Sequence, residues 1–230
     1  MYNDKLTILP TSPLFAGMSP EDIQHITICF QPRVVQFSKH TYLAIENQPF
    51  TGLGILLTGE ASVVKETMSG ARIILTMLQA GNLFGEMIAF SAKPCWPASV
   101  VAQTDCSALF IPPQKIVGEC AHACPGHQQL IRNLLGILSE KAILLNRKVE
   151  YLSLKSLRSK IATYLLEQQK RSGKTIFLLP LKRNDLADFL NVSRTALSRE
   201  MGRMRDEGLI EFYRSSIKLL QPEELKKNLF

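Results

Sequence analysis

The sequence predicts an α+β protein built from a small antiparallel β-roll, a long helix and a winged helix-turn-helix. Short runs rich in Val, Ile, Leu and Phe, with glycines at or beside the turns, extend from Arg33 to Pro112. This pattern is typical of a small barrel or roll. Apolar residues at helical spacing follow Pro125, and two short helical patterns with an alternating hairpin follow Leu181. The expected parts are residues 1–125, 126–153 and 154–230.

The first part should begin with a short helix and continue as strands. Ser19 suits an N-cap, Pro20 suits the first helical position and two acids follow, so we expect a helix to about Phe30. Beyond this helix the spacing of apolar residues becomes that of strands. The expected strands include Leu53 to Leu57, Ala61 to Lys65, Arg72 to Leu78, Ala98 to Ala102 and Ala108 to Ile111.

The second part is an expected helix with an apolar stripe of about four heptads, weakened at Lys141 or Ala142. One helix cannot bury such a stripe by itself, so it either lies across the roll or pairs with the same helix of a second chain. We expect a parallel homodimer whose helix also touches the roll, with a break near residues 153–155. The expected dimer contacts are Ile131, Leu134, Leu138, Leu145, Val149 and Leu152.

The region from Leu181 to Ile210 predicts a helix-turn-helix. Asn191 tolerates the left-handed backbone region that a tight turn needs, and Ser193 can cap the second helix. A hairpin after Gly208 should form the wing. Apolar residues of the second helix then face inward, at Leu197, Met201 and Met204. The cap and the outward residues are the expected DNA contacts, Ser193, Arg194, Thr195, Ser198, Arg199 and Arg203.

Positive charge is concentrated in the C-terminal third of the chain. Residues 147–230 hold 18 Lys and Arg against 10 Asp and Glu, a net charge of +8, whereas residues 1–146 hold 9 against 10, a net charge of −1. This asymmetry favours a duplex DNA partner over an ordinary helical hairpin with a solvated face. No basic amphipathic helix, lipidation signal, signal peptide or membrane span accompanies the charge. We therefore expect a cytoplasmic protein that binds no membrane.

Three fragments, in one order, resemble the cyclic-AMP receptor protein and fumarate-nitrate reductase regulator (CRP/FNR) family of bacterial transcription factors. They are L-G-I-L-L-T-G-E-A-S-V at 53–63, G-N-L-F-G-E at 81–86 and N-V-S-R-T-A-L-S-R at 191–199. The resemblance covers nearly the whole chain. It implies a jelly roll like that of cyclic-nucleotide-binding domains, a non-enzymatic homodimer, a near-palindromic DNA site and RNA polymerase as a protein partner.

The resemblance also implies an effector pocket, which departs from the family pattern. Gly85 and Glu86 match the pocket pair whose glutamate contacts the ribose of a cyclic nucleotide. Trp96 and Pro97, followed by Ala98, stand where nucleotide-binding members place an Arg-Ser or Arg-Thr pair on the phosphate. The charge of a buried phosphate would be uncompensated without these donors, so we expect an effector other than cyclic AMP. The alternative is that Glu86 is a structural acid that caps the turn after it.

The predicted recognition helix departs from the family as well. Arg194 and Arg199 match family positions that contact DNA, and an arginine fork can read guanine in the major groove. Thr195 replaces a glutamate found in many members, so the half-site should differ from that of the cyclic-AMP receptor. Ser198 and Arg203 are expected to contact phosphate or sugar.

A group of thiols and imidazoles lies between the roll and the long helix. Cys120, Cys124 and His127, with His122 between them, suit zinc, iron or a cluster, and would form a metal or redox sensor. Their spacing is not that of a common zinc module. The alternative is that both cysteines pack as small apolar residues and that the histidines lie on the surface.

Two other classes of protein fit parts of the pattern. A small barrel can hold a catalytic metal, as in a cupin-like enzyme, but His25 and His40 are isolated and no expected strand pairs histidines with a carboxylate. The second class is a ligand-binding regulatory module that controls a protein partner and never touches DNA. Absent or salt-insensitive duplex binding would favour that class.

Overall fold

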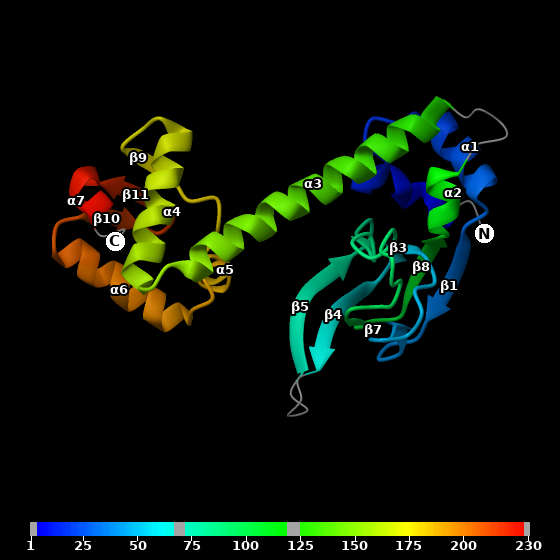
Figure 1. The fold of residues 1–230 in the computed structure, drawn as a ribbon, viewed down its shortest axis with the longest axis horizontal. Coiled ribbons are helices and arrows are strands. Elements are labelled where there is room, and N and C mark those ends of the chain that lie inside the picture. Colours follow the sequence, from blue (N-terminus) through cyan, green and yellow to red (C-terminus); the bar gives the residue numbers. More distant parts are fainter. Residues whose placement is uncertain (1–3, 67–71, 119–124, 228–230) are drawn as a thin grey trace. The chain divides into compact units, whose positions relative to one another are not determined.

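The computed structural model describes residues 4–66, 72–118 and 125–227 (Figure 1). The chain forms two compact units, Met1–Lys141 and Ala142–Phe230. The division falls within one long helix, α3 (Pro125–Ser153). No helix in the described ranges is long and apolar enough to cross a membrane.

The first unit contains two four-stranded antiparallel sheets, in the orders β1-β8-β3-β6 and β2-β7-β4-β5. The predicted β-roll and all five quoted strands are confirmed, and three further short strands complete the sheets. The strands are β1 (Arg33–Phe37), β2 (Tyr42–Ala44), β3 (Leu53–Thr58), β4 (Glu60–Glu66), β5 (Arg72–Gln79), β6 (Leu83–Phe84), β7 (Ser99–Ala102) and β8 (Cys106–Ile111).

Helices cover one face of the roll. The predicted first helix is α1 (Pro20–Phe30), and Ser19 caps it by accepting a hydrogen bond from the backbone N–H of Asp22 at 3.1 Å. It packs with α2 (Pro113–Val117), with the short η1 (Asp4–Thr11) and η2 (Pro13–Phe15), and with the first half of α3 around one apolar core (Figure 1). This packing orders the start of α3 against the roll.

The second unit is a winged helix-turn-helix. Its three-stranded sheet has the order β10-β11-β9, and its core includes the predicted inward residues Leu197, Met201 and Met204, each fully buried. The elements after α3 are α4 (Leu157–Ser172), β9 (Ile176–Leu178), α5 (Arg183–Phe189), α6 (Arg194–Asp206), β10 (Ile210–Tyr213), β11 (Ser216–Leu219) and α7 (Pro222–Lys227).

The end of α3 belongs to the second unit. The helix breaks after Ser153 and the chain resumes a helix at Leu157, as the sequence predicts. Tyr151, however, lies before the break, is only 2% exposed and packs against Tyr164 and Phe189 in the core of the second unit. The last turn of α3 is therefore fixed to the second unit, and the packing boundary precedes the break in the helix.

The apolar stripe of α3 is divided between two environments. Leu134 is 3% exposed and lies in the core of the first unit, so its expected place in an exposed dimer seam is wrong. Ile131 and Leu138 are partly buried against the same core. The last three predicted contacts are largely exposed, with Leu145 at 53%, Val149 at 55% and Leu152 at 44%.

A corrected stripe contains Leu135 in place of Leu134. Leu135 is 59% exposed. With Leu135 and Ala142 included, the steps from Ile131 to Leu152 alternate regularly between four and three residues, which is the spacing of a coiled-coil seam. The corrected stripe is Ile131, Leu135, Leu138, Ala142, Leu145, Val149 and Leu152.

Candidate nucleic-acid interface and effector pocket

The turn between α5 and α6 forms as its residue types require. Asn191 adopts a left-handed conformation, with φ of 55°. Ser193 is the N-cap of α6, and its hydroxyl oxygen accepts a hydrogen bond from the backbone N–H of Ala196 at 3.1 Å. These two residues set the direction in which α6 leaves the turn. Ser193 thus has a local structural role besides any contact with DNA.

The N-terminal half of α6 presents an exposed polar face. Arg194, Thr195, Ser198 and Arg199 line a single shallow hollow, so four of the predicted contacts lie together. Within the described ranges, neither Arg194 nor Arg199 forms an ion pair with a carboxylate. Two arginine side chains are therefore available for an anionic partner on the same face of the helix.

The C-terminal half of α6 is held by Arg158 of α4. Its Nε donates to Glu200 Oε1 at 2.7 Å, and Nη1 and Nη2 donate to the two carboxylate oxygens of Glu207 at 2.6 and 2.7 Å. The hydrogen bond from Arg158 lowers the pKa of Glu207. A guanidinium that donates to both oxygens of one carboxylate fixes the relative orientation of the two groups and also pairs their charges. No local sequence pattern marks Arg158, whose partners are 42 and 49 residues away.

Arg203, a predicted phosphate contact, is partly engaged within its own helix. Its Nη1 lies 3.3 Å from Glu200 Oε2, yet 64% of its side chain is exposed. The exposed guanidinium can still reach a phosphate, but its pair with Glu200 offsets part of its charge. Arg203 is accordingly a weaker candidate than Arg194 and Arg199.

Arg183 is a further cation beside this surface, and it was not among the predicted contacts. It lies at the start of α5, stacks over the Phe212 ring at 5.2 Å, and its Nη2 donates to the Arg214 carbonyl at 3.4 Å. Burial, and then the nearby Arg194 charge, lower its pKa. No carboxylate of the described chain pairs with Arg183, so the positive charges of Arg183 and Arg194 repel each other. A bound phosphate would reduce this repulsion.

The predicted wing is present as the β10–β11 hairpin. Arg214 occupies the turn with φ of 53°, and its guanidinium lies 5.4 Å from the centre of the Tyr213 ring. Tyr213 is 73% exposed. A cation and an aromatic ring at an exposed tip complete a basic face on the second unit.

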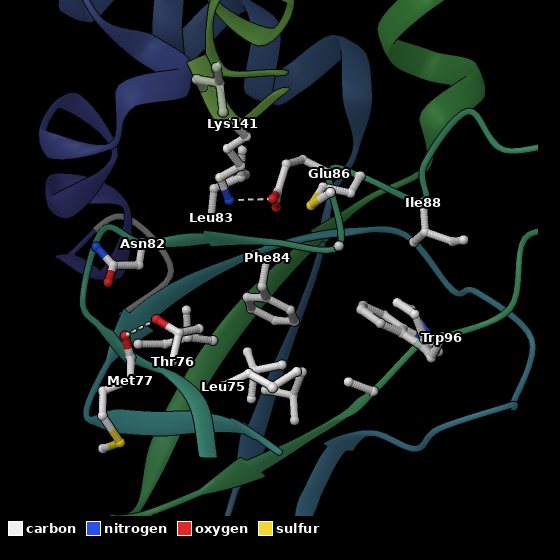
Figure 2. Close-up of a pocket in the computed structure, with 18 of the residues that line it drawn as sticks. Leu75, Thr76, Met77, Asn82, Leu83, Phe84, Glu86, Ile88, Trp96 and Lys141 are labelled. Atoms are coloured by element: carbon white, nitrogen blue, oxygen red, sulfur yellow. Dashed lines mark hydrogen bonds and ion pairs between the residues drawn. The ribbon is translucent and has the colours of Figure 1, made fainter. Parts of the chain in front are cut away.

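The five residues predicted to form an effector pocket come together in the first unit. Gly85, Glu86, Trp96, Pro97 and Ala98 all line a cavity of about 590 Å³. Strands β5 and β6, the loop that follows β6, and α3 supply its walls (Figure 2). A cavity of this size accommodates a small organic molecule.

Trp96 forms an aromatic wall of this cavity. It is 3% exposed and packs 4.8 Å from Phe50 and 6.1 Å from Phe84, measured between ring centres. Gly85 has φ of 82°, and a Cβ there would lie 2.8 Å from both Phe50 Cε2 and Trp96 Cη2. Glycine at position 85 therefore allows the loop to pass close to the aromatic rings.

Glu86 is buried and pairs with Lys141, which was not among the predicted pocket residues. Its Oε1 accepts from Lys141 Nζ of α3, as Figure 2 shows, whereas Oε2 is buried without a hydrogen-bond partner. The turn after Glu86 is closed by the backbone, with Ile88 N–H donating to Gly85 carbonyl at 3.2 Å. The alternative role of Glu86 as a cap of this turn is therefore not supported. Its carboxylate faces the cavity instead.

Two family models and several curated proteins match this chain. The sequence matches the family described as cyclic nucleotide-binding domain over residues 34–122 and the Crp-like helix-turn-helix domain over residues 159–227. The cyclic AMP receptor protein of Thermus thermophilus is 23% identical over 95% of this chain and 97% of its own length. The CRP-like cAMP-activated global transcriptional regulator of Mycobacterium tuberculosis is 23% identical over 96% of this chain and 97% of its own length.

The chain belongs to the CRP/FNR family of transcription regulators. Solved structures agree with the fold of this CRP/FNR protein. The catabolite activator protein of Thermus thermophilus has a TM-score of 0.54 at 22% identity, covering 95% of this chain and 99% of that one. CprK complexed with OCPA has a TM-score of 0.59 at 14% identity, covering 90% and 93% of the two chains. The predicted fold class and the predicted DNA-binding regulator are thus confirmed.

Of the three metal-site residues predicted in this CRP/FNR protein, His127 lies in the described part of the chain. Cys120 and Cys124 lie outside the described residues. His127 is 8% exposed, its Nε2 lies 2.6 Å from the Ile116 carbonyl oxygen, and its ring meets Phe30 edge-on at 5.3 Å. His127 is therefore a packed core residue and does not lie on the surface. Among the residues with described positions, no three His, Cys, Asp or Glu side chains gather as metal ligands.

Proposed function

We propose that this CRP/FNR protein binds a near-palindromic duplex as a parallel homodimer, and that a small-molecule effector in the first unit controls its DNA binding. The exposed, unpaired Arg194 and Arg199 on α6 carry the DNA part of this proposal. The role is regulatory, without catalysis, in the cytoplasm, and RNA polymerase is the expected protein partner. Metal or redox sensing through Cys120, Cys124 and His127 is a second candidate means of control, and the burial of His127 against the Ile116 carbonyl argues against it.

The corrected stripe on α3 supports the homodimer. Leu135, Leu145, Val149 and Leu152 are each more than two-fifths exposed, which is unusual for a regular row of large apolar side chains. Pairing with the same row of a second copy would remove this surface from water and place the two-fold axis along α3. Two recognition helices related by that axis would then enter successive major grooves about 34 Å apart.

The residues of α3 that line the cavity support effector control. Ile137 and Lys141 form part of its wall, and both belong to the helix that carries the proposed dimer stripe. A ligand that contacts them alters the packing of α3 against the first unit. Control then needs only that the ligand binds one arrangement of α3 more tightly than another. CprK, whose solved structure shares the fold, is complexed with OCPA.

Replacing Arg199 with alanine should weaken specific DNA binding by about 5- to 150-fold, equivalent to about 1–3 kcal/mol, because an arginine fork to guanine is lost. Fluorescence anisotropy with the selected duplex and single-base variants of it measures this change. The preference at one base position should relax, and wild-type affinity should fall steeply as salt increases.

Arg205→Ala is the matched control for Arg199→Ala. It removes the same charge from the last turn of the same helix, where Arg205 pairs with Asp206 at 2.8 Å and lies 5.6 Å from the centre of the Phe212 ring. It should change affinity little at every base. Equal losses on all sequences for Arg199→Ala would make Arg199 a phosphate contact, and salt-insensitive binding would argue against the DNA interface.

A further inference from the structure

Among the residues that the structure describes, every lysine that lines the cavity in the first unit lies beside a carboxylate. In the described part of the chain its charged lining residues are Lys65, Glu86 and Lys141. Lys141 pairs with Glu86, and Lys65 lies 3.6 Å from Glu46. An entering phosphate or carboxylate would have to share these lysines with Glu46 or with the buried Glu86, and its charge would be only partly compensated.

The remaining surface of the cavity is mostly apolar. Trp96, Phe84 and Ile88 surround its centre together with Leu75 of β5, as Figure 2 shows. Ile137 adds an apolar side chain from α3. Burial of apolar area of a ligand against such a surface makes the free energy of binding more favourable. The indole of Trp96 favours an aromatic ring beside it.

One polar atom in the cavity is left unsatisfied. Glu86 is 4% exposed, and its Oε2 atom has no hydrogen-bond partner although Oε1 is paired with Lys141. A buried carboxylate oxygen without a donor is unfavourable, and a donor supplied by a ligand would remove that cost. The carboxylate therefore selects for an O–H or N–H group at one end of the ligand.

We propose that the effector is an uncharged, mainly apolar compound that presents one hydroxyl or N–H donor to Glu86 Oε2 and packs against Trp96. This inference rests on the proposed effector control and specifies the ligand class for the same cavity. Lys141 already balances the charge of Glu86, so the ligand needs no charge of its own. Its donor binds Oε2 while Lys141 keeps Oε1.

Three related probes test the ligand class. They are 4-phenylphenol, its methyl ether, which lacks the donor, and biphenyl-4-carboxylate, which adds a negative charge. Calorimetric titration of the full-length protein gives the affinities, and a change in Trp96 emission places the probe in this cavity, because the chain has one tryptophan. The phenol should bind about tenfold or more tightly than either of the others, since hydrogen bonds to charged groups are among the stronger ones.

Glu86→Leu should make the phenol and its ether bind equally, and Glu86→Gln should reduce the preference if the leucine variant is unfolded by circular dichroism. The proposal is overturned if none of the probes binds, if the ether or carboxylate binds the wild type as tightly as the phenol, or if cyclic AMP binds more tightly. It is also overturned if the preference survives both substitutions. DNA binding of the same samples without probe is measured separately, so a failure of the DNA-binding proposal is distinguished from a failure of the ligand class.

Discussion

Replacing Leu145 and Val149 together with glutamate should convert the protein to a monomer and weaken binding to a two-half-site duplex by about a hundredfold or more. Both side chains are exposed in the single chain and lie in the proposed seam. In a dimer the substitutions would bury four like charges beside one another, at a cost of several kcal/mol. Loss of the second recognition helix removes the avidity that joins two half-sites.

Analytical ultracentrifugation measures the oligomeric state, and anisotropy measures DNA affinity. The control is the double substitution of Ile143 and Leu144 with glutamate, which adds the same charge at positions of similar exposure, 57% and 56%, outside the stripe. The control should remain a dimer. A control that dissociates as readily as the seam variant would show that the interface lies elsewhere on α3.

Leu134→Ala should destabilise the first unit by about 2–5 kcal/mol, whereas Leu135→Ala should change its stability by less than about 0.5 kcal/mol. The reason is burial. Leu134 is 3% exposed in the core, and the neighbouring Leu135 is 59% exposed. Truncation of Leu134 leaves a cavity between α3 and the roll. Truncation of Leu135 leaves a space that water fills.

Urea unfolding followed by the emission of Trp96 reports on the first unit, which contains this residue. Leu134→Ala and Leu135→Ala should be compared in the monomeric variant that carries Leu145→Glu and Val149→Glu. Dimerisation then adds nothing to the measured free energy of unfolding. In the dimer, Leu135→Ala should instead weaken self-association. Equal destabilisation by both substitutions in the monomer would contradict the packing of α3 described above.

The sequence predicted features that depend on local chemistry. The cap at Ser193, the left-handed Asn191 and the inward Leu197 each follow from residue types a few positions apart, and the structure contains all of them. The strands could also be predicted, because the alternation of apolar and polar residues and the glycines at the turns are local signals. The pocket residues Glu86 and Trp96 came from the resemblance to the family, which carries information about distant parts of the chain.

Features that depend on long-range contacts were not predictable from one sequence. Between Ile131 and Leu138, either Leu134 or Leu135 gives steps of three and four residues, so helical spacing cannot choose between them. Only the packing of α3 on the roll decides that Leu134 points inward. The partner of Glu86, Lys141, is 55 residues away, and nothing in its neighbourhood marks it as part of the cavity.

Selection of bound duplexes from a pool with a randomised centre tests whether the protein reads DNA as a symmetric dimer. We expect enrichment of a near-palindromic sequence whose two half-sites have centres about 10 base pairs apart. The enriched duplex should bind Arg199→Ala less tightly than wild type. Enrichment of a single half-site would contradict the dimeric arrangement, and the absence of any enriched sequence would contradict sequence-specific DNA recognition by α6.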